Sequence, residues 1–203
     1  MQAGSWKTAL RRIAKLFCVS ALCLIAVTLQ AQETTFELDP EKTTVEFTLG
    51  DILHTVHGTF KAKSGNLRLD PASGLVSGAF VIDATSGQSG NKTRDRKMHN
   101  EILESAQYPE VRFTPNKITG AIAPQGSSTI QVQGVFTLHG SDHDITLSVP
   151  VKVTGNEAVA NINFQVPYVA WGLKNPSTFL LRVSKEVEIS ITATGRFVPG
   201  RTP

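Results

Sequence analysis

The chain has 203 residues, of which 40% are hydrophobic and 18% are charged, and this composition excludes global disorder. The formal net charge is +3, but four of the 20 Lys and Arg residues and none of the 17 Asp and Glu residues lie in the first 31 positions. The rest of the chain therefore has 16 basic and 17 acidic residues, a balance that argues against binding to nucleic acid.

The N-terminal 31 residues have the pattern of a secretory signal peptide. Basic residues between Lys7 and Lys15 precede an almost continuously apolar run at 16–29, and Ala31 is a small residue suited to the position before a cleavage site. We expect residues 1–31 to be removed on export and 32–203 to form one domain in the periplasm or outside the cell. A retained membrane anchor is the alternative.

Both cysteines, Cys18 and Cys23, lie in the predicted signal peptide. The mature chain would then contain no thiol. A disulfide, a cysteine nucleophile and a thiolate metal site are therefore not expected in it.

From residue 43 onward, apolar and polar residues alternate, which is typical of strands that bury one face. Turn residues separate these sets at 70–74, 124–128, 140–142 and 155–156. About eight strands joined mostly by short loops predict an antiparallel meander, which must close or stack to protect its edges.

One segment has a helical pattern instead. Met98, Ile102 and Ala106 are spaced four apart, so the sequence predicts a helix over 94–106 whose apolar stripe packs on the sheet. Asn91 or Thr93 could cap it.

Several short motifs follow one another along the mature chain. They are FELDP at 36–40, TTVEF at 43–47, VHGTF at 56–60 with SG at 64–65, RD at 94–95, YPEVRF at 108–113, GVFTLHG at 134–140 and ITL at 145–147. No single motif is distinctive, but their order and spacing together are. This order resembles that of the YceI-like family of polyisoprenoid-binding proteins over nearly all of the mature chain.

The resemblance implies an all-β fold, an eight-stranded antiparallel lipocalin-like barrel with one short helix and an apolar lumen. It also implies a long isoprenoid ligand of the quinone or polyisoprenoid type. The sequence departs from the family at Lys42, Gly50 and Lys97, where many members carry histidine. Head-group contacts through those histidines are therefore not carried over.

The residues expected to bind the ligand lie on the apolar side of the strands or in the segment after 166. Phe47, Phe113, Phe136 and Phe164 belong to four strands and are expected to line one cavity, because one side of every barrel strand faces inward. The full set is Val45, Phe47, Leu49, Phe80, Ile82, Val111, Phe113, Phe136, Leu138, Leu147, Val149, Ile162, Phe164, Tyr168 and Trp171.

The segment 166–176 is irregular, because Pro167 and Pro176 exclude it from a central strand. Two interpretations stay open. It forms a rim or lid in which Tyr168 and Trp171 touch the ligand, or it plugs the end of the barrel with both rings as core.

Four histidines are candidates for a metal site. His54 and His57 are three residues apart, and His139 and His143 flank a turn. Zinc requires three or four strong ligands, so solvated turn residues are the favoured interpretation of the second pair and a weak metal site the alternative.

The sequence favours a binding protein over an enzyme. It has no Gly-x-Ser-x-Gly elbow and no Gly-rich phosphate loop, and Glu101 and Glu104 fit a solvated helix face. We expect an isoprenoid lipid or quinone as a non-covalent ligand, and no cofactor, metal or nucleic acid. A transient membrane contact and the oligomeric state stay open. The alternatives are a filled barrel that acts as a protein-interaction module and an enzyme working in the lumen.

Overall fold

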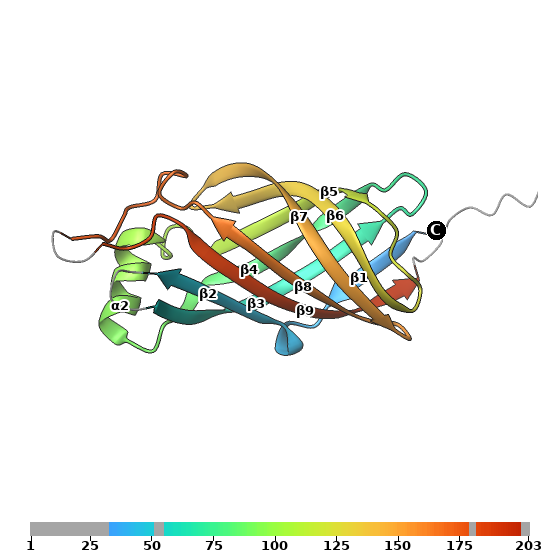
Figure 1. Cartoon of the computed structure of the whole chain (residues 1–203), viewed down its shortest axis with the longest axis horizontal. Helices are drawn as coiled ribbons and strands as arrows, with labels where there is room; N and C mark the ends of the chain where they lie inside the picture. The colour runs from blue at the N-terminus through green and yellow to red at the C-terminus, as the bar shows by residue number, and fades with distance from the viewer. Residues whose placement is uncertain (1–32, 51–54, 179–181, 200–203) are drawn as a thin grey trace, which may run out of the picture. The chain divides into compact units, whose positions relative to one another are not determined.

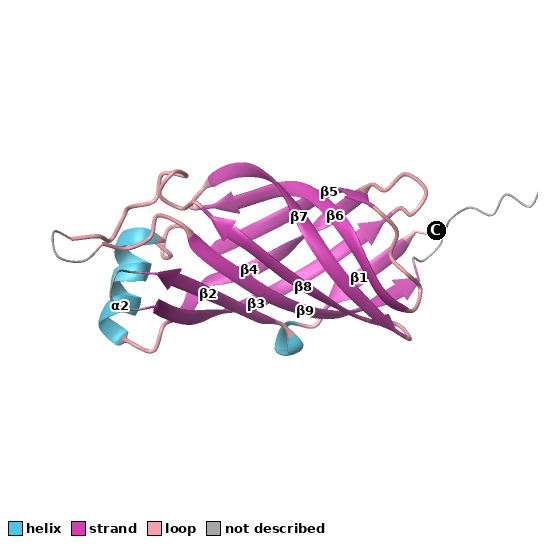
Figure 2. Cartoon of the chain, viewed as in Figure 1, coloured by secondary structure: helices cyan, strands magenta, loops and turns pink. Residues whose placement is uncertain are grey.

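The computed structural model describes residues 33–50, 55–178 and 182–199, and the account below concerns the unit from Gln32 to Pro203. Within these ranges nine strands form one antiparallel sheet (Figures 1 and 2). They are β1 (Thr34–Leu38), β2 (Thr44–Gly50), β3 (Thr55–Leu69), β4 (Val76–Gln88), β5 (Glu110–Thr119), β6 (Gly126–Leu138), β7 (Ser141–Thr154), β8 (Glu157–Val166) and β9 (Val187–Pro199).

The sheet closes into a barrel because its first and last strands pair. Each strand from β2 to β9 pairs with the next along the chain, and β2 also pairs with β9. Short β1 continues the line of β2, since both pair with β3 on one side and β9 on the other. The nine strands therefore fill eight places, and the expected eight-stranded barrel is confirmed.

The break between β1 and β2 has a local cause. A single 3-10 turn, η1 (Pro40–Lys42), begins at Asp39, whose carboxylate accepts a hydrogen bond from the Glu41 amide. Pro40 lacks an amide hydrogen and cannot continue the ladder. Thr43 then returns the chain to the wall, where its hydroxyl donates to the Asp39 carbonyl at 2.8 Å.

Alternation along the strands separates the inside of the barrel from the outside. In β7, Leu147, Val149, Val151 and Val153 are buried and the residues between them are exposed. Gly65 of β3 lets two inner side chains approach the wall. A Cβ there would lie 2.5 Å from the Phe80 ring and 2.7 Å from the Leu38 Cβ.

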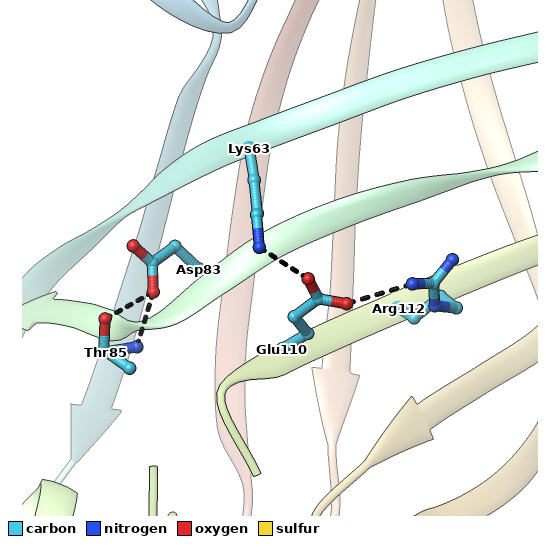
Figure 3. Close-up of polar contacts among 5 residues, drawn as sticks. All are labelled: Lys63, Asp83, Thr85, Glu110 and Arg112. Atoms are coloured by element: carbon cyan, nitrogen blue, oxygen red, sulfur yellow. Dashed lines mark hydrogen bonds and ion pairs between the residues drawn. The ribbon is translucent and has the colours of Figure 1, made fainter. Parts of the chain in front are cut away.

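Polar contacts occupy the outer surface of β3, β4 and β5 (Figure 3). Lys63 and Arg112 donate to the two oxygens of Glu110 at 2.7 and 2.9 Å. The hydrogen bond from Lys63, joined by that from Arg112, lowers the pKa of Glu110. Asp83 accepts from the hydroxyl and amide of Thr85, and the hydroxyl contact is the main cause of its lowered pKa.

The predicted helix exists but is shorter at its C-terminal end. It comprises α2 (Lys92–Lys97) and a π-helical turn, η2 (Met98–Ile102), and lies at the end of the barrel where β2 ends (Figure 1). Asn91 caps it by accepting from the Thr93 and Arg94 amides. The part of the chain that the structure describes contains no helix long and apolar enough to cross a bilayer.

The expectation that Ala106 completes the helical stripe is wrong. Glu104 adopts a positive φ of 44°, which stops the helix, and Ala106 is exposed in the turn that follows. Met98 and Ile102 do pack on the barrel. The Met98 methyl lies 2.7 Å from where a Cβ on Gly87 would stand, and Ile102 joins the apolar cluster at the barrel end.

Candidate functional site

An apolar cavity of about 140 Å³ lies inside the barrel. All the strands except β2 contribute side chains to it. Its wall is Phe36, Leu38, Thr43, Leu67, Leu69, Phe80, Ile82, Val111, Phe113, Ile118, Ile122, Ile130, Val132, Phe136, Leu147, Val149, Val151, Ala158, Ala160, Ile162, Phe164, Ile191, Ala193 and Phe197. The hydroxyl of Thr43 already bonds to the backbone, so the wall has only hydrocarbon to offer a ligand.

Phenylalanine rings in the cavity wall form two groups with edge-on contacts. Phe36 contacts Phe80 and Phe197 edge-on, with ring centroids 6.1 and 5.6 Å apart. Phe136 and Phe164 meet in the same way at 5.8 Å. The rest of the wall consists mostly of Val, Ile, Leu and Ala.

The structure brings nine of the fifteen predicted site residues to the cavity wall. Every strand from β4 to β8 contributes at least one of them. They are Phe80, Ile82, Val111, Phe113, Phe136, Leu147, Val149, Ile162 and Phe164.

The other six lie closer to the helix end of the barrel and do not line the cavity. Val45 and Phe47 are buried on the inner side of β2, and Phe47 packs on Phe60 with ring centroids 5.4 Å apart. The expectation that four phenylalanines line one cavity is therefore wrong for Phe47. Its side chain is buried as expected, but it packs on the Phe60 ring and is not among the residues that line the cavity. The remaining four, Leu49, Leu138, Tyr168 and Trp171, belong to a second apolar cluster.

This second cluster fills the barrel end, and its members include the irregular segment after β8. Tyr168 and Leu173 are buried in it, and Ile102 and Leu103 pack against it from the helix side. The Tyr168 hydroxyl donates to the Ser184 carbonyl at 2.6 Å, and burial raises the pKa of Tyr168. Of the two open interpretations, the arrangement fits the plug, since both aromatic rings of the segment pack in this cluster.

His143 lies under the plug and not in a solvated turn, so that expectation is wrong for this residue. The turn is tighter than expected: β7 begins at Ser141 and His143 points inward as the cross-strand partner of Phe136. Its ring stacks on Trp171 at 3.9 Å with an angle of 6° between the planes. No hydrogen-bond partner reaches its buried Nε2.

His139 is also held in place. Its Nε2 lies 2.7 Å from a carboxylate oxygen of Glu104, and its ring packs on Tyr108. Within the described ranges, no three His, Cys, Asp or Glu side chains gather where they could hold a metal ion. His57 contacts the Thr48 hydroxyl on the exterior, and His54 lies outside the described residues.

Sequence reasoning missed fifteen residues of the cavity wall. Val132, Val151 and Ile191 lie on the apolar side of alternating stretches, so the period of two that places the predicted residues inward applies to them as well. Extending the β7 set backward from Ile145 by two residues would also have placed His143 inside. Phe36 and Phe197 pair across β1 and β9, a contact between the two ends of the domain for which the sequence carries no local signal.

The cavity has the size and chemistry for hydrocarbon. Its 140 Å³ compares with an engineered apolar cavity of about 150 Å³ that stays dry and binds benzene. Pockets for drug-sized ligands measure roughly 300–1,000 Å³. A segment of a slender chain therefore fits as the cavity stands, whereas a long chain requires the lining rings to change rotamer. The described residues that line the cavity include no titratable side chain.

Comparisons with known proteins agree with this architecture. A UPF0312 protein of Pseudomonas putida (strain W619) is 26% identical over 148 residues, which cover 69% of this chain and 73% of the relative. The crystal structure of BcnA from Burkholderia cenocepacia superposes with a TM-score of 0.63 at 20% identity, covering 77% of this chain and 98% of that one.

A polyisoprenoid binding domain from Saccharophagus degradans superposes with a TM-score of 0.61 at 15% identity, covering 79% of this chain and 97% of that domain. At these identities the solved structures establish the shared fold. The model of the YceI-like domain matches residues 36–195, which is most of the chain. The protein therefore belongs to the YceI-like domain family.

Proposed function

We propose that this barrel binds a long isoprenoid lipid, of the quinone or polyisoprenoid type, with the chain in its lumen. The observation that carries the proposal is the cavity wall, which is hydrocarbon apart from one hydroxyl that is already bonded. The structurally similar domain from Saccharophagus degradans is described as polyisoprenoid binding, which supports the same ligand class here.

Such a ligand would bind because its apolar surface leaves water. This contributes on the order of 25 cal/mol per Å² before the cost of ordering the chain. The interior of an eight-stranded barrel is just wide enough to hold one small ligand. An isoprenoid chain is slender and flexible, so it can enter such a lumen. Rotation of Phe113 and Phe136 would lengthen the space, since both rings line it.

Binding without chemistry is the role that we assign to the lumen. The described residues that line the cavity include no titratable side chain, and the Thr43 hydroxyl already bonds to the backbone. A carrier, store or scavenger of isoprenoid lipid needs no catalytic group.

We further propose that the chain is exported and that the mature protein begins near Gln32 in the periplasm or outside the cell. Intact mass of the exported protein would test this.

A filled barrel that serves as an interaction module is the second candidate. The observation in its favour is the modest cavity volume of about 140 Å³, well below that of an open tunnel. The two functions differ in whether the lumen can take up a chain.

The test is a matched pair of tryptophan substitutions. Phe164 lines the cavity and Gln133 is exposed on the outside of β6. Phe164→Trp would fill the lumen at a cost of about 1–3 kcal/mol in the free energy of unfolding. We expect this variant to remain folded by circular dichroism and to take up much less radiolabelled polyprenol than the wild type.

Gln133→Trp is the control and should load like the wild type. If the wild type and both variants are folded and none takes up polyprenol, the binding function is refuted and the interaction module replaces it. Equal loading of Phe164→Trp would place the ligand outside this cavity.

A further inference from the structure

His143 has a buried ring nitrogen that makes no hydrogen bond. Among the residues that the structure describes, His143 Nε2 is the one buried side-chain nitrogen or oxygen without a hydrogen bond. Burying a polar group unpaired costs free energy, and nearly all such groups in folded proteins find a partner. A folded chain that keeps one unpaired therefore needs a reason for it.

The position of His143 connects it with the lumen. It stands directly opposite Phe136 in the β6–β7 ladder, and residues opposite each other in a sheet point to the same face. Phe136 lines the cavity, as do Leu147 and Val149, which follow His143 on the same side of β7. His143 is thus the imidazole at the helix end of an otherwise hydrocarbon channel.

One side chain covers this imidazole face to face. Trp171 stacks on it at 3.9 Å and also contacts Phe136, with ring centroids 5.7 Å apart. Trp171 belongs to no strand or helix, and its amide bonds locally to the Pro167 carbonyl at 3.0 Å. Rotation of this ring would change access to His143 without breaking the barrel ladder.

We propose that His143 is the head-group subsite of the lumen. Its Nε2 hydrogen-bonds the terminal oxygen of an isoprenoid alcohol or quinone whose chain runs past Phe136 into the cavity. This inference rests on the proposed binding function and adds which end of the lumen holds the head group. A hydroxyl both donates and accepts, so it pairs with either tautomer of the imidazole, whereas a carbonyl pairs only with the Nε2–H form.

The experiment compares two ligands that differ by one hydroxyl group. A polyprenol and the matched polyprenyl hydrocarbon are titrated into the purified protein in a Trp6→Phe background, so that Trp171 is the one fluorescent tryptophan of the two in the sequence. We expect the polyprenol to bind about tenfold more tightly, which corresponds to about 1.4 kcal/mol. We also expect it to shift the Trp171 emission more than the hydrocarbon does.

His143→Phe keeps an aromatic ring against Trp171 and removes Nε2. We expect this variant to bind both ligands with equal affinity and to bind the hydrocarbon as the wild type does. His57→Phe is the control, because His57 is exposed on the outside of β3, and it should retain the tenfold preference.

Each outcome has one meaning. Equal affinity of the wild type for both ligands, or a preference retained in His143→Phe, overturns the head-group assignment and leaves lumen binding intact. Failure of the wild type to bind either ligand overturns the binding function itself. If His143→Phe does not fold, the ¹⁵N resonance of His143 Nε2 in the wild type must shift with the polyprenol and not with the hydrocarbon.

Discussion

The middle of the barrel and its helix end are built by different means. In the middle, alternation along the strands brings aliphatic and phenylalanine side chains to one cavity, whose wall, in the part of the chain that the structure describes, contains one hydroxyl, that of Thr43. At the helix end, Tyr168, His143 and Ser105 are drawn inside with specific neighbours. The middle of the barrel can bury an apolar chain without requiring particular positions of its atoms. The helix end instead holds specific polar side chains in fixed contacts.

Ser105 takes part in hydrogen bonds that hold the helix end of the barrel together. It is buried, and its hydroxyl lies 3.0 Å from Nδ1 of His99. The other ring nitrogen of His99 lies 2.9 Å from the Gly87 carbonyl of β4. The histidine therefore ties the turn after the helix to the barrel wall. Directional contacts of this kind set one geometry, while apolar contacts in the middle tolerate rearrangement of the rings.

The largest effect is expected where the two regions meet. Phe136 lines the cavity and contacts both Phe164 and Trp171. Phe136→Ala should lower the free energy of unfolding by about 3–5 kcal/mol, because it removes a buried ring from both regions. Urea denaturation measures this. Gln133→Ala on the exterior of the same strand should stay within about 0.5 kcal/mol of the wild type, and a similarly small loss for Phe136→Ala would show that the two regions do not share this ring.

A smaller effect is expected at the helix. Ile102 is half-buried against the end cluster, so Ile102→Asp places a charge among apolar side chains. We expect a loss of about 2–3 kcal/mol in the same assay. Asn100→Asp, at an exposed position of the same turn, is the control. If both variants unfold at the wild-type urea concentration, the helix does not contribute to closing the barrel.

The smallest of the three effects concerns a single hydrogen bond. Tyr168→Phe removes the contact with the Ser184 carbonyl and should cost about 1 kcal/mol at neutral pH. Burial raises the pKa of Tyr168, so the folded state binds its proton more tightly than the unfolded state does. The wild type should therefore lose stability as the pH rises from the ordinary tyrosine value through the raised one.

The phenylalanine variant lacks this titration, so its stability should fall less over the same alkaline range. Parallel urea denaturation curves of both proteins between neutral and alkaline pH test the difference. An identical pH dependence would mean that the Tyr168 hydroxyl is solvated in the folded protein.

The barrel middle could be predicted from the sequence because its rule is local. In β7, each second residue from Leu147 to Val153 is apolar, and each of them is buried. Nine predicted residues reached the cavity wall by this rule alone. The closure of the barrel came from the family resemblance, since the alternation is the same in an open sheet.

The helix end was harder to predict because its contacts join distant segments. Phe47 obeys the alternation, yet its ring packs on Phe60 and does not line the cavity. The sequence predicts a turn beside His143, but the turn in the structure is shorter and β7 already begins at Ser141. The stacking partner of His143 is Trp171, 28 positions later in the sequence. The early end of the helix depends on the left-handed backbone at Glu104, which spacing does not reveal.

The central claim is that the lumen holds an isoprenoid chain. The most direct measurement is mass spectrometry of an organic extract from the protein purified out of cells that make isoprenoid lipids, with Phe164→Trp purified in parallel. We expect the wild type to yield one class of polyprenyl compound in near-stoichiometric amount and the variant to yield far less. A folded wild type that releases no isoprenoid, and takes none up when it is offered, would contradict the account.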